Sequence, residues 1–160
     1  KKMSLIYWLL KEEEKVLFLK KILSGTGAIF ATVDAGLHDD ITAAISHVPH
    51  IVAASLVNMV RENDTSNELM KTFAAGGFKD ITRIASSSPE MWESICLSNA
   101  DSIDHFLSLM IDELTKMRSY IANEQGGEIN HFFASQENTE TRFIKLSDYI
   151  IYKKNLRSLV

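Results

Sequence analysis

The scarcity of helix breakers limits the fold of this chain more than any other feature of its sequence. The 160 residues include two prolines and seven glycines. Because these two residue types interrupt helices most strongly, their rarity predicts a mainly α fold. Apolar residues recur at helical spacing in seven stretches: 3–23, 39–62, 66–75, 78–86, 89–98, from Asp101 onward, and from Glu128 to about Arg157.

Local signals set several helix ends. Thr65 and Glu68 have the spacing of a capping box, which predicts a helix beginning at about residue 66. Ser88 followed by Pro89 is typical of an N-cap and a first helical position. Residues 126–127 are both glycine and are expected to separate the last two helices.

Residues 28–34 (AIFATVD) are the exception to the helical pattern. This stretch is short, apolar and β-branched, so it predicts a strand. A lone strand leaves backbone groups without partners. We therefore expect it to pair with a partner chain, or to belong to a sheet whose other strands are not in this sequence. The first 36 residues are accordingly expected to be the end of a larger domain.

The composition excludes several classes of protein. Hydrophobic residues make up 46% of the chain and charged residues 24%, which indicates a globular domain. A net charge of −4 argues against nonspecific nucleic-acid binding. The apolar runs are interrupted before the roughly 20 residues of a membrane span, so no membrane association is expected. Cys96 is the one cysteine, which excludes an internal disulfide and fits a cytoplasmic protein.

Three of the five histidines lie within residues 38–50. His47 and His50 are three residues apart and share a helix face. Pro49 cannot donate to the carbonyl of Ile45, so a kink is expected that leaves polar backbone groups open near His47. A neutral imidazole at such a kink is a candidate general base or hydrogen-bond acceptor. A core histidine bonded to a neighbour is the competing interpretation.

The same stretch permits a metal site. His38, Asp39, His47 and His50 are all possible ligands, and a His-Asp doublet is found in metal-dependent phosphohydrolases. No histidine precedes His38, and no later carboxylate stands at an obvious ligand spacing. A metal-dependent phosphohydrolase is therefore kept as an alternative, while the preferred interpretation has no metal.

A second stretch begins with two adjacent glycines. Gly76 and Gly77 precede a predicted helix and could bring free N–H groups to a carboxylate. An ordinary turn between helices is the competing interpretation. Arg83 lies among apolar residues and is expected to pair with a carboxylate, for which Asp80 is the candidate. Trp92 is expected in the core.

Together these two stretches resemble the prephenate dehydrogenase family. The first motif is His38-Asp39 followed by residues 43–50 (AAISHVPH), and the second is residues 76–87 (GGFKDITRIASS) followed by 89–92 (PEMW) and Asn99. The resemblance covers roughly residues 12–145.

The resemblance implies two domains, of which the chain holds one and part of the other. Residues 1–36 would be the C-terminal remnant of a Rossmann-type nucleotide-binding domain, and 37–160 an all-helical domain for substrate binding and dimerisation. The Gly-x-Gly-x-x-Gly loop is expected upstream of Lys1, so NAD or NADP would bind mainly there. The chain is expected to form a homodimer and to be inactive alone.

The resemblance also implies a reaction and a set of residues. The family converts prephenate to 4-hydroxyphenylpyruvate by NAD-dependent oxidative decarboxylation, in tyrosine biosynthesis. By resemblance, His47 accepts a hydrogen bond from the ring hydroxyl and helps to remove its proton. Arg142, which follows the Phe132-Phe133 pair, would bind a substrate carboxylate, although a solvated helix charge is the alternative. Gly76 and Gly77 would line the substrate pocket.

Two further functions remain open from the sequence, beside the metal-dependent phosphohydrolase. Arogenate dehydrogenases share the helical motif and differ in their substrate and often in their cofactor. A non-catalytic helical dimerisation module is the alternative from another class of protein.

Overall fold

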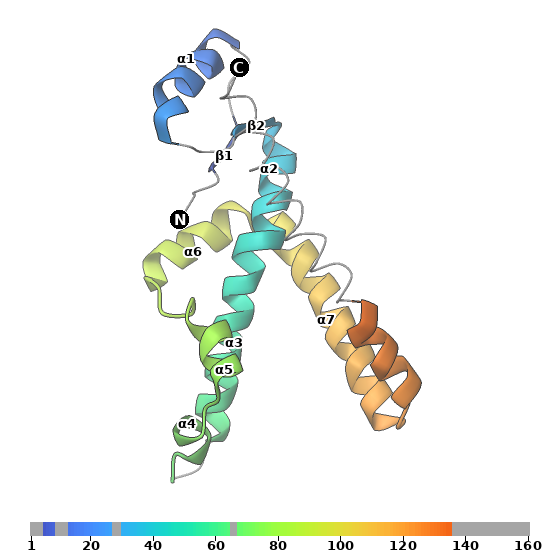
Figure 1. The fold of residues 1–160 in the computed structure, drawn as a ribbon. Helices are drawn as coiled ribbons and strands as arrows, with labels where there is room; N and C mark the ends of the chain where they lie inside the picture. Colours follow the sequence, from blue (N-terminus) through green and yellow to red (C-terminus); the bar gives the residue numbers. More distant parts are fainter. Residues whose placement is uncertain (1–4, 9–12, 27–29, 65–66, 136–160) are drawn as a thin grey trace. The chain divides into compact units, whose positions relative to one another are not determined.

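The computed structural model describes residues 5–8, 13–26, 30–64 and 67–135. The chain divides into two compact units, Lys1–Ser108 and Leu109–Val160, with the boundary inside one long helix. The described part is mainly helical, as the sequence predicts (Figure 1).

The first unit begins with two short strands joined by a helix. Strand β1 (Leu5–Trp8) and strand β2 (Phe30–Val33) are parallel, with Leu5 opposite Phe30 and Trp8 opposite Val33. Helix α1 (Glu13–Leu23) and a 3-10 turn, η1 (Ser24–Thr26), lie between them in sequence. This is the connection that parallel strands require.

The pairing of β1 with β2 corrects two predictions. The strand within 28–34 is confirmed, but its partner lies in the same chain, at Leu5–Trp8. The helix predicted over 3–23 is wrong in its first part and begins at Glu13. Residues 5–8 (LIYW) include aromatic and β-branched residues, which favour strands. Pairing with β2 gives their backbone N–H and C=O groups hydrogen-bond partners, an effect that a search for helical periodicity does not detect.

One continuous helical run follows, made of α2 (Ala35–Thr42), a π-helical turn η2 (Ala43–His47) and α3 (Val48–Asn63). It starts four residues before the predicted Asp39, because the Asp34 carboxylate accepts the Leu37 N–H at 2.9 Å and caps the helix. Near Pro49 the helix widens: the Val48 N–H donates to the Ala43 carbonyl, five residues back. The widened turn accommodates a proline that cannot donate to Ile45.

By length and composition alone, the helical run Ala35–Asn63 could cross a membrane, and it is the one such helix among the described residues. We expected charged residues and histidines to interrupt every apolar run before it reached this length. In this run they are too few to do so. Polar side chains from other helices nevertheless bond to this run: Asn99 donates to the Asp39 carbonyl, and Ser102 donates to the Asp40 carboxylate. These contacts are typical of a helix packed against protein.

Two short helices lie beside α3, namely α4 (Leu69–Thr72) and α5 (Gly76–Thr82). The capping box predicted at residue 65 is wrong. The Asp64 carboxylate caps α4 by accepting the N–H groups of Met70 and Lys71, and Glu68 stands before the helix in the left-handed region, with φ of 48°. The helix predicted over 66–75 therefore shrinks to four residues.

Helix α5 begins at Gly76 and ends at Thr82, where the sequence predicts 78–86. The glycines thus start a helix rather than stand before it. Helix α6 (Pro89–Ser98) has the predicted bounds, and the Ser88 hydroxyl accepts the Met91 N–H at 3.3 Å.

Helix α7 (Ala100–Ala122) includes Asp101 in its first turn. It ends before Glu124, whose φ of 53° reverses the chain, and residues 126–135 are again helical. The break therefore precedes residues 126–127, and these glycines begin the next helix. The predicted continuation to Arg157 lies outside the described residues.

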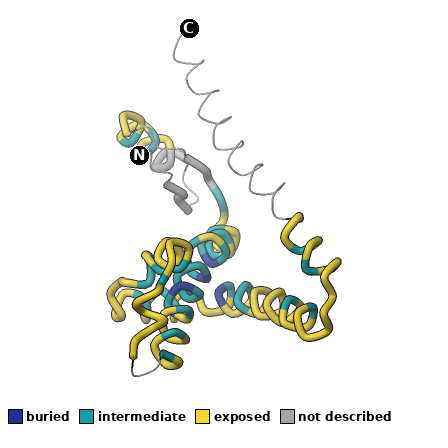
Figure 2. The backbone as a smooth tube through the Cα atoms, turned by 60° about the horizontal axis from the view of Figure 1, so that its bottom comes forward, coloured by how far each residue is buried: buried dark blue, intermediate teal, exposed yellow. Residues whose placement is uncertain are grey.

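The core of the described part is small. Its buried hydrophobic side chains are those of Ala43, Val48, Ala53 and Ile103, and Asn99 is the buried polar residue (Figure 2). Three of these five residues belong to the run η2–α3, so the core follows the helix that carries the histidines.

Candidate active site around His47

His47 ends the π-helical turn, and its ring contacts a buried amide from a distant part of the chain. The Asn99 side-chain Nδ2 lies 3.2 Å from His47 Nδ1 and donates to the Asp39 carbonyl at 2.9 Å. Asn99 is the C-cap of α6 and is 9% exposed. Asn99 thus joins the Asp39 carbonyl of α2 to the His47 ring at the end of the π-helical turn.

His50 lies one turn further along and bonds within its own helix. Its Nδ1 lies 2.8 Å from the Ser46 carbonyl. A carbonyl oxygen only accepts, so Nδ1 of His50 carries a hydrogen. A neutral His50 therefore has its lone pair on Nε2, and this nitrogen can accept a proton.

Trp92 of α6 contacts both imidazoles. Its ring lies 4.5 Å from that of His50, tilted by 33°, and 6.2 Å from that of His47 in an edge-on arrangement of 84°. Trp92 is half-buried, so its predicted place in the core is only partly attained. Its indole shields one side of the histidine pair from water and limits the positions the two rings can adopt.

The site favours neutral His47. Burial, and next the charge that His50 would carry, lower the pKa of His47 below its usual value of 6.5. The Asp39 carboxylate acts in the opposite direction, and His38 lowers the pKa slightly further. A neutral imidazole is the form that can exchange a proton with a substrate hydroxyl.

His38 belongs to a separate pair. Its Nδ1 lies 2.9 Å from the Asp39 carboxylate. The four candidate metal ligands therefore divide between this pair and two histidines bonded to Asn99 and the Ser46 carbonyl. Among the described residues, no group of three or more His, Cys, Asp or Glu side chains could hold a metal ion.

The other predicted site residues are not brought to His47 by any described contact. Gly76 and Gly77 are exposed in the first turn of α5, where a Cβ added to either would meet nothing within 4 Å. Arg142 lies outside the described residues. Arg83 is exposed and forms no ion pair with Asp80, so that expectation is wrong.

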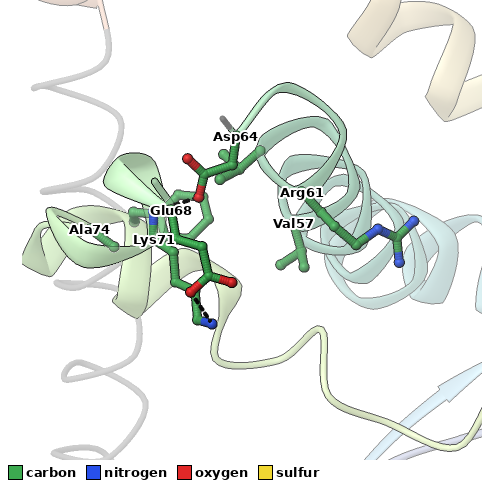
Figure 3. A pocket seen from close by; sticks show the side chains of 8 residues that line it. Val57, Arg61, Asp64, Glu68, Lys71 and Ala74 are labelled. Atoms are coloured by element: carbon green, nitrogen blue, oxygen red, sulfur yellow. Dashed lines mark hydrogen bonds and ion pairs between the residues drawn. The ribbon is translucent and has the colours of Figure 1, made fainter. Parts of the chain in front are cut away.

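Two cavities of the first unit are not lined by His47 itself. The larger, about 610 Å³, has α3 on one side and α4 and α5 on the other; Val57 and Phe78 supply apolar surface, and Arg61 and Lys71 supply positive charge (Figure 3). Lys71 is already bonded to Glu68 at 2.9 Å. The smaller, about 370 Å³, is bordered by Asn99 and three aspartates, Asp39, Asp40 and Asp101, a poor environment for an anion.

Asn99 is the functional candidate that sequence reasoning missed. The sequence shows an asparagine between two predicted helices, which ordinarily indicates a helix end. No periodicity connects it with His47, which is 52 residues earlier. The one sequence signal for a role of Asn99 is that the second motif ends at this residue.

Comparison with known proteins identifies relatives over most of the chain. Residues 34–135 match the family described as "Prephenate dehydrogenase, dimerization domain". The chain is 45% identical over 122 residues to the prephenate dehydrogenase of Bacillus subtilis (strain 168), covering 76% of this chain and 33% of that protein. It is 38% identical over 103 residues to the cyclohexadienyl dehydrogenase of Zymomonas mobilis, covering 62% and 35%. The chain thus spans about a third of the length of these relatives.

Solved structures share the fold. The A. aeolicus prephenate dehydrogenase in complex with hydroxyphenyl propionate and NAD+ aligns with a TM-score of 0.80 at 25% identity, over 88% of this chain and 50% of that one. The Synechocystis arogenate dehydrogenase aligns with a TM-score of 0.75 at 22% identity, over 86% and 52%.

Proposed function

Because the chain belongs to the prephenate dehydrogenase family, through the dimerization domain at residues 34–135, we propose that the full-length protein oxidatively decarboxylates prephenate to 4-hydroxyphenylpyruvate. The family match, with 45% identity to the Bacillus subtilis enzyme, is the observation that carries this proposal. Residues 1–36 then belong to the end of a nucleotide-binding domain. The β1–α1–β2 order supports this, because parallel strands joined by a helix are the repeating unit of such domains.

His47 is the proposed proton-handling residue. Its lowered pKa keeps the imidazole neutral, as exchange of the substrate hydroxyl proton requires. The bond from Asn99 occupies Nδ1, so the substrate would meet Nε2. To accept a proton at Nε2, His47 must hold its ring hydrogen on Nδ1 instead, and the Asn99 amide must then present its oxygen. His50, whose Nε2 is already an acceptor, is the natural comparison.

The two substrate carboxylates need cationic or N–H partners. Arg142 is proposed for one of them, since a guanidinium binds a carboxylate through two parallel hydrogen bonds. Gly76 and Gly77 are proposed to line the pocket. The free space around both glycines supports close approach of a ligand or a partner chain.

The chain itself does not fit a dinucleotide. Its seven glycines form no Gly-x-Gly-x-x-Gly run, and no described strand is followed by a glycine-rich turn into a helix. NAD or NADP is proposed to bind to the rest of the full-length protein. The 160 residues alone are therefore expected to be inactive.

A homodimer through the helical domain is also proposed. Large apolar side chains are exposed along the second-unit part of α7: Leu109, Met110, Ile111, Leu114 and Ile121. Surfaces of this kind are normally covered by a partner. The dimerization role of the matching family supports a second copy as that partner. The free cysteine, Cys96, is consistent with the proposed cytoplasmic location.

NADH or NADPH formation by the full-length protein tests the proposal. Prephenate and arogenate are offered in parallel, each with NAD and with NADP. Turnover of prephenate is expected; preference for arogenate would identify the variant activity instead. A folded dimer inactive on both substrates would contradict the proposal and favour a non-catalytic dimerisation module.

Variants then separate the histidines. His47→Asn is expected to lower kcat by about a hundredfold or more, with substrate binding largely kept. His50→Asn is compared under the same conditions, and His105→Asn, at an exposed position of α7, is the control. An unchanged kcat in His47→Asn would remove the role proposed for His47.

A further inference from the structure

One side chain, that of Asn99, contacts two residues of the helical run that are eight positions apart. Its Nδ2 lies 2.9 Å from the Asp39 carbonyl and 3.2 Å from His47 Nδ1. In a regular α-helix, residues eight apart differ by about 80° around the axis, because each residue turns the chain by about 100°. Residues seven apart differ by only about 20°. A regular helix would therefore turn Ser46, and not His47, toward Asn99.

The π-helical turn accounts for the contact with His47. Its closing bond runs from the Val48 N–H to the Ala43 carbonyl, five residues back, whereas an α-helix bonds four residues back. The turn thus contains one residue more than an α-helical turn, so the residues that follow are set back by one position. At the end of the turn, His47 takes the place that Ser46 would have in a regular helix. It therefore lies on the same side of the run as Asp39.

Other helices hold both halves of the run, so contacts on either side of the turn fix the offset between them. Before the turn, Ser102 of α7 donates to the Asp40 carboxylate at 2.8 Å. After the turn, α3 contacts α5. The two residues whose backbone groups close the turn, Ala43 and Val48, are buried, whereas Ile45 between them is 68% exposed. The turn is therefore a packed part of the core, with Ile45 on its outer side.

Pro49 opposes closure of the turn into a regular helix. In a regular helix its ring would clash with the Ile45 carbonyl, and it has no N–H to donate there. In the structure Pro49 is the second residue of α3, in a first helical turn, where a missing N–H is tolerated. The π-helical turn thus gives the chain a new helix start just after His47, at the place where the proline requires one.

We propose that Pro49 is a positioning residue, which keeps the π-helical turn from closing and thereby turns His47 toward Asn99 and α6. The part of this statement that concerns the backbone stands by itself. Its consequence for catalysis rests on the function proposed above, in which His47 exchanges a proton with the substrate.

Pro49→Ala in the full-length protein tests the proposal. Alanine supplies the missing N–H and removes the ring, so the turn is expected to close into a regular helix. A crystal structure of the variant is expected to show Ser46 in place of His47 beside Asn99. The misplaced imidazole should lower kcat at least about tenfold, with a smaller change in KM.

The other proline of the chain provides the matched control. Pro89 is the first residue of α6, where its missing N–H has no partner in the helix to lose. Pro89→Ala is therefore expected to leave both kcat and the π-helical turn unchanged.

Deletion of Ile45 in the Pro49→Ala background separates an effect of helical register from a general loss of packing. The deletion removes an exposed residue, and a regular helix then places Asp39 and His47 seven positions apart, on one side of the axis. This double variant is expected to return His47 to Asn99 and to recover most of the lost kcat. If Pro49 only supported the helix, the deletion would add to the damage instead.

The crystal structures report the register independently of turnover. A regular helix in the full-length wild type, or a π-helical turn retained in Pro49→Ala, would overturn the proposal. So would a folded double variant in which His47 stays away from Asn99. A closed turn with unchanged kcat would contradict the catalytic consequence alone. Inactivity of the wild type on both substrates would contradict the proposed function and leave the register to be decided by the structures.

Discussion

The run η2–α3 and the second-unit part of α7 are both apolar helices, but they differ in how far their apolar side chains are buried. The first buries Ala43, Val48 and Ala53, and its polar residues bond to side chains from other helices. In the second, residues 109–122, large apolar side chains such as Leu114 and Ile121 stay 61% exposed. Small buried residues allow close approach within one chain, whereas large exposed ones require a surface that the described residues do not supply.

The comparison shows that the same periodicity serves two purposes. Around His47 the helix bonds to residues of its own chain. Along α7 it leaves large apolar side chains exposed, and we propose that a second copy covers them, in agreement with a dimerization-domain family. Variants in α7 should therefore weaken dimerisation, whereas variants around His47 should lower the free energy of unfolding or the catalytic rate.

The largest effect is expected from Leu114→Asp. If a second copy covers α7, the buried charge should weaken dimerisation by about a hundredfold or more, roughly 3 kcal/mol. Thr115→Asp adds the same charge one residue away, on the polar side of the helix, and should leave the dimer intact. Sedimentation of the full-length proteins measures both. A dimer as stable as wild type in Leu114→Asp would remove this helix from the interface.

Trp92→Ala is expected to act on the other region. Loss of the indole that contacts both imidazoles should lower the free energy of unfolding by about 2 kcal/mol, below the value for a fully buried tryptophan. Leu97→Ala, on the same helix but 73% exposed, should change it by less than about 0.5 kcal/mol. Urea unfolding compares them. Equal losses in the two variants would show that the histidine contacts add nothing.

The lowered pKa of His47 predicts a pH dependence of stability. Because the folded state binds the proton less readily than the unfolded state, the contribution is complete above 6.5 and is lost as the pH falls through the lowered folded pKa. His50, Asp39 and His38 act on the same ring. His47→Gln should flatten this part of the urea-midpoint profile, whereas His105→Gln should not. A wild-type profile with no decline below 6.5 would contradict the neutral state.

The smallest effect is expected from Ser102→Ala. It removes one exposed hydrogen bond to Asp40, 2.8 Å long, and should cost about 0.5–1 kcal/mol. Ser98→Ala removes only a local bond to the Ile95 carbonyl and should cost less. If the two variants lose the same free energy of unfolding in urea, the bond from Ser102 of α7 to Asp40 of α2 adds no more stability than a local bond.

The sequence by itself determined the features that depend on near neighbours. The rarity of helix breakers implied a mainly helical chain, Ser88-Pro89 predicted α6, and β-branched residues predicted β2. Caps, turns and periodicity act within a few residues, so local patterns were sufficient. The two motifs also indicated the family, and the match over 34–135 confirms it.

The tertiary structure decided whatever depends on residues far apart in the chain. The partner of β2 is Leu5–Trp8, about 25 residues earlier, and helical periodicity concealed that strand. A π-helical turn precedes Pro49, where the sequence indicated only that the regular hydrogen bond to Ile45 is missing. Asn99 meets His47 across 52 residues, with its amide Nδ2 3.2 Å from Nδ1 of the imidazole. Such contacts arise only when helices pack, because packing alone brings a donor to a particular ring nitrogen.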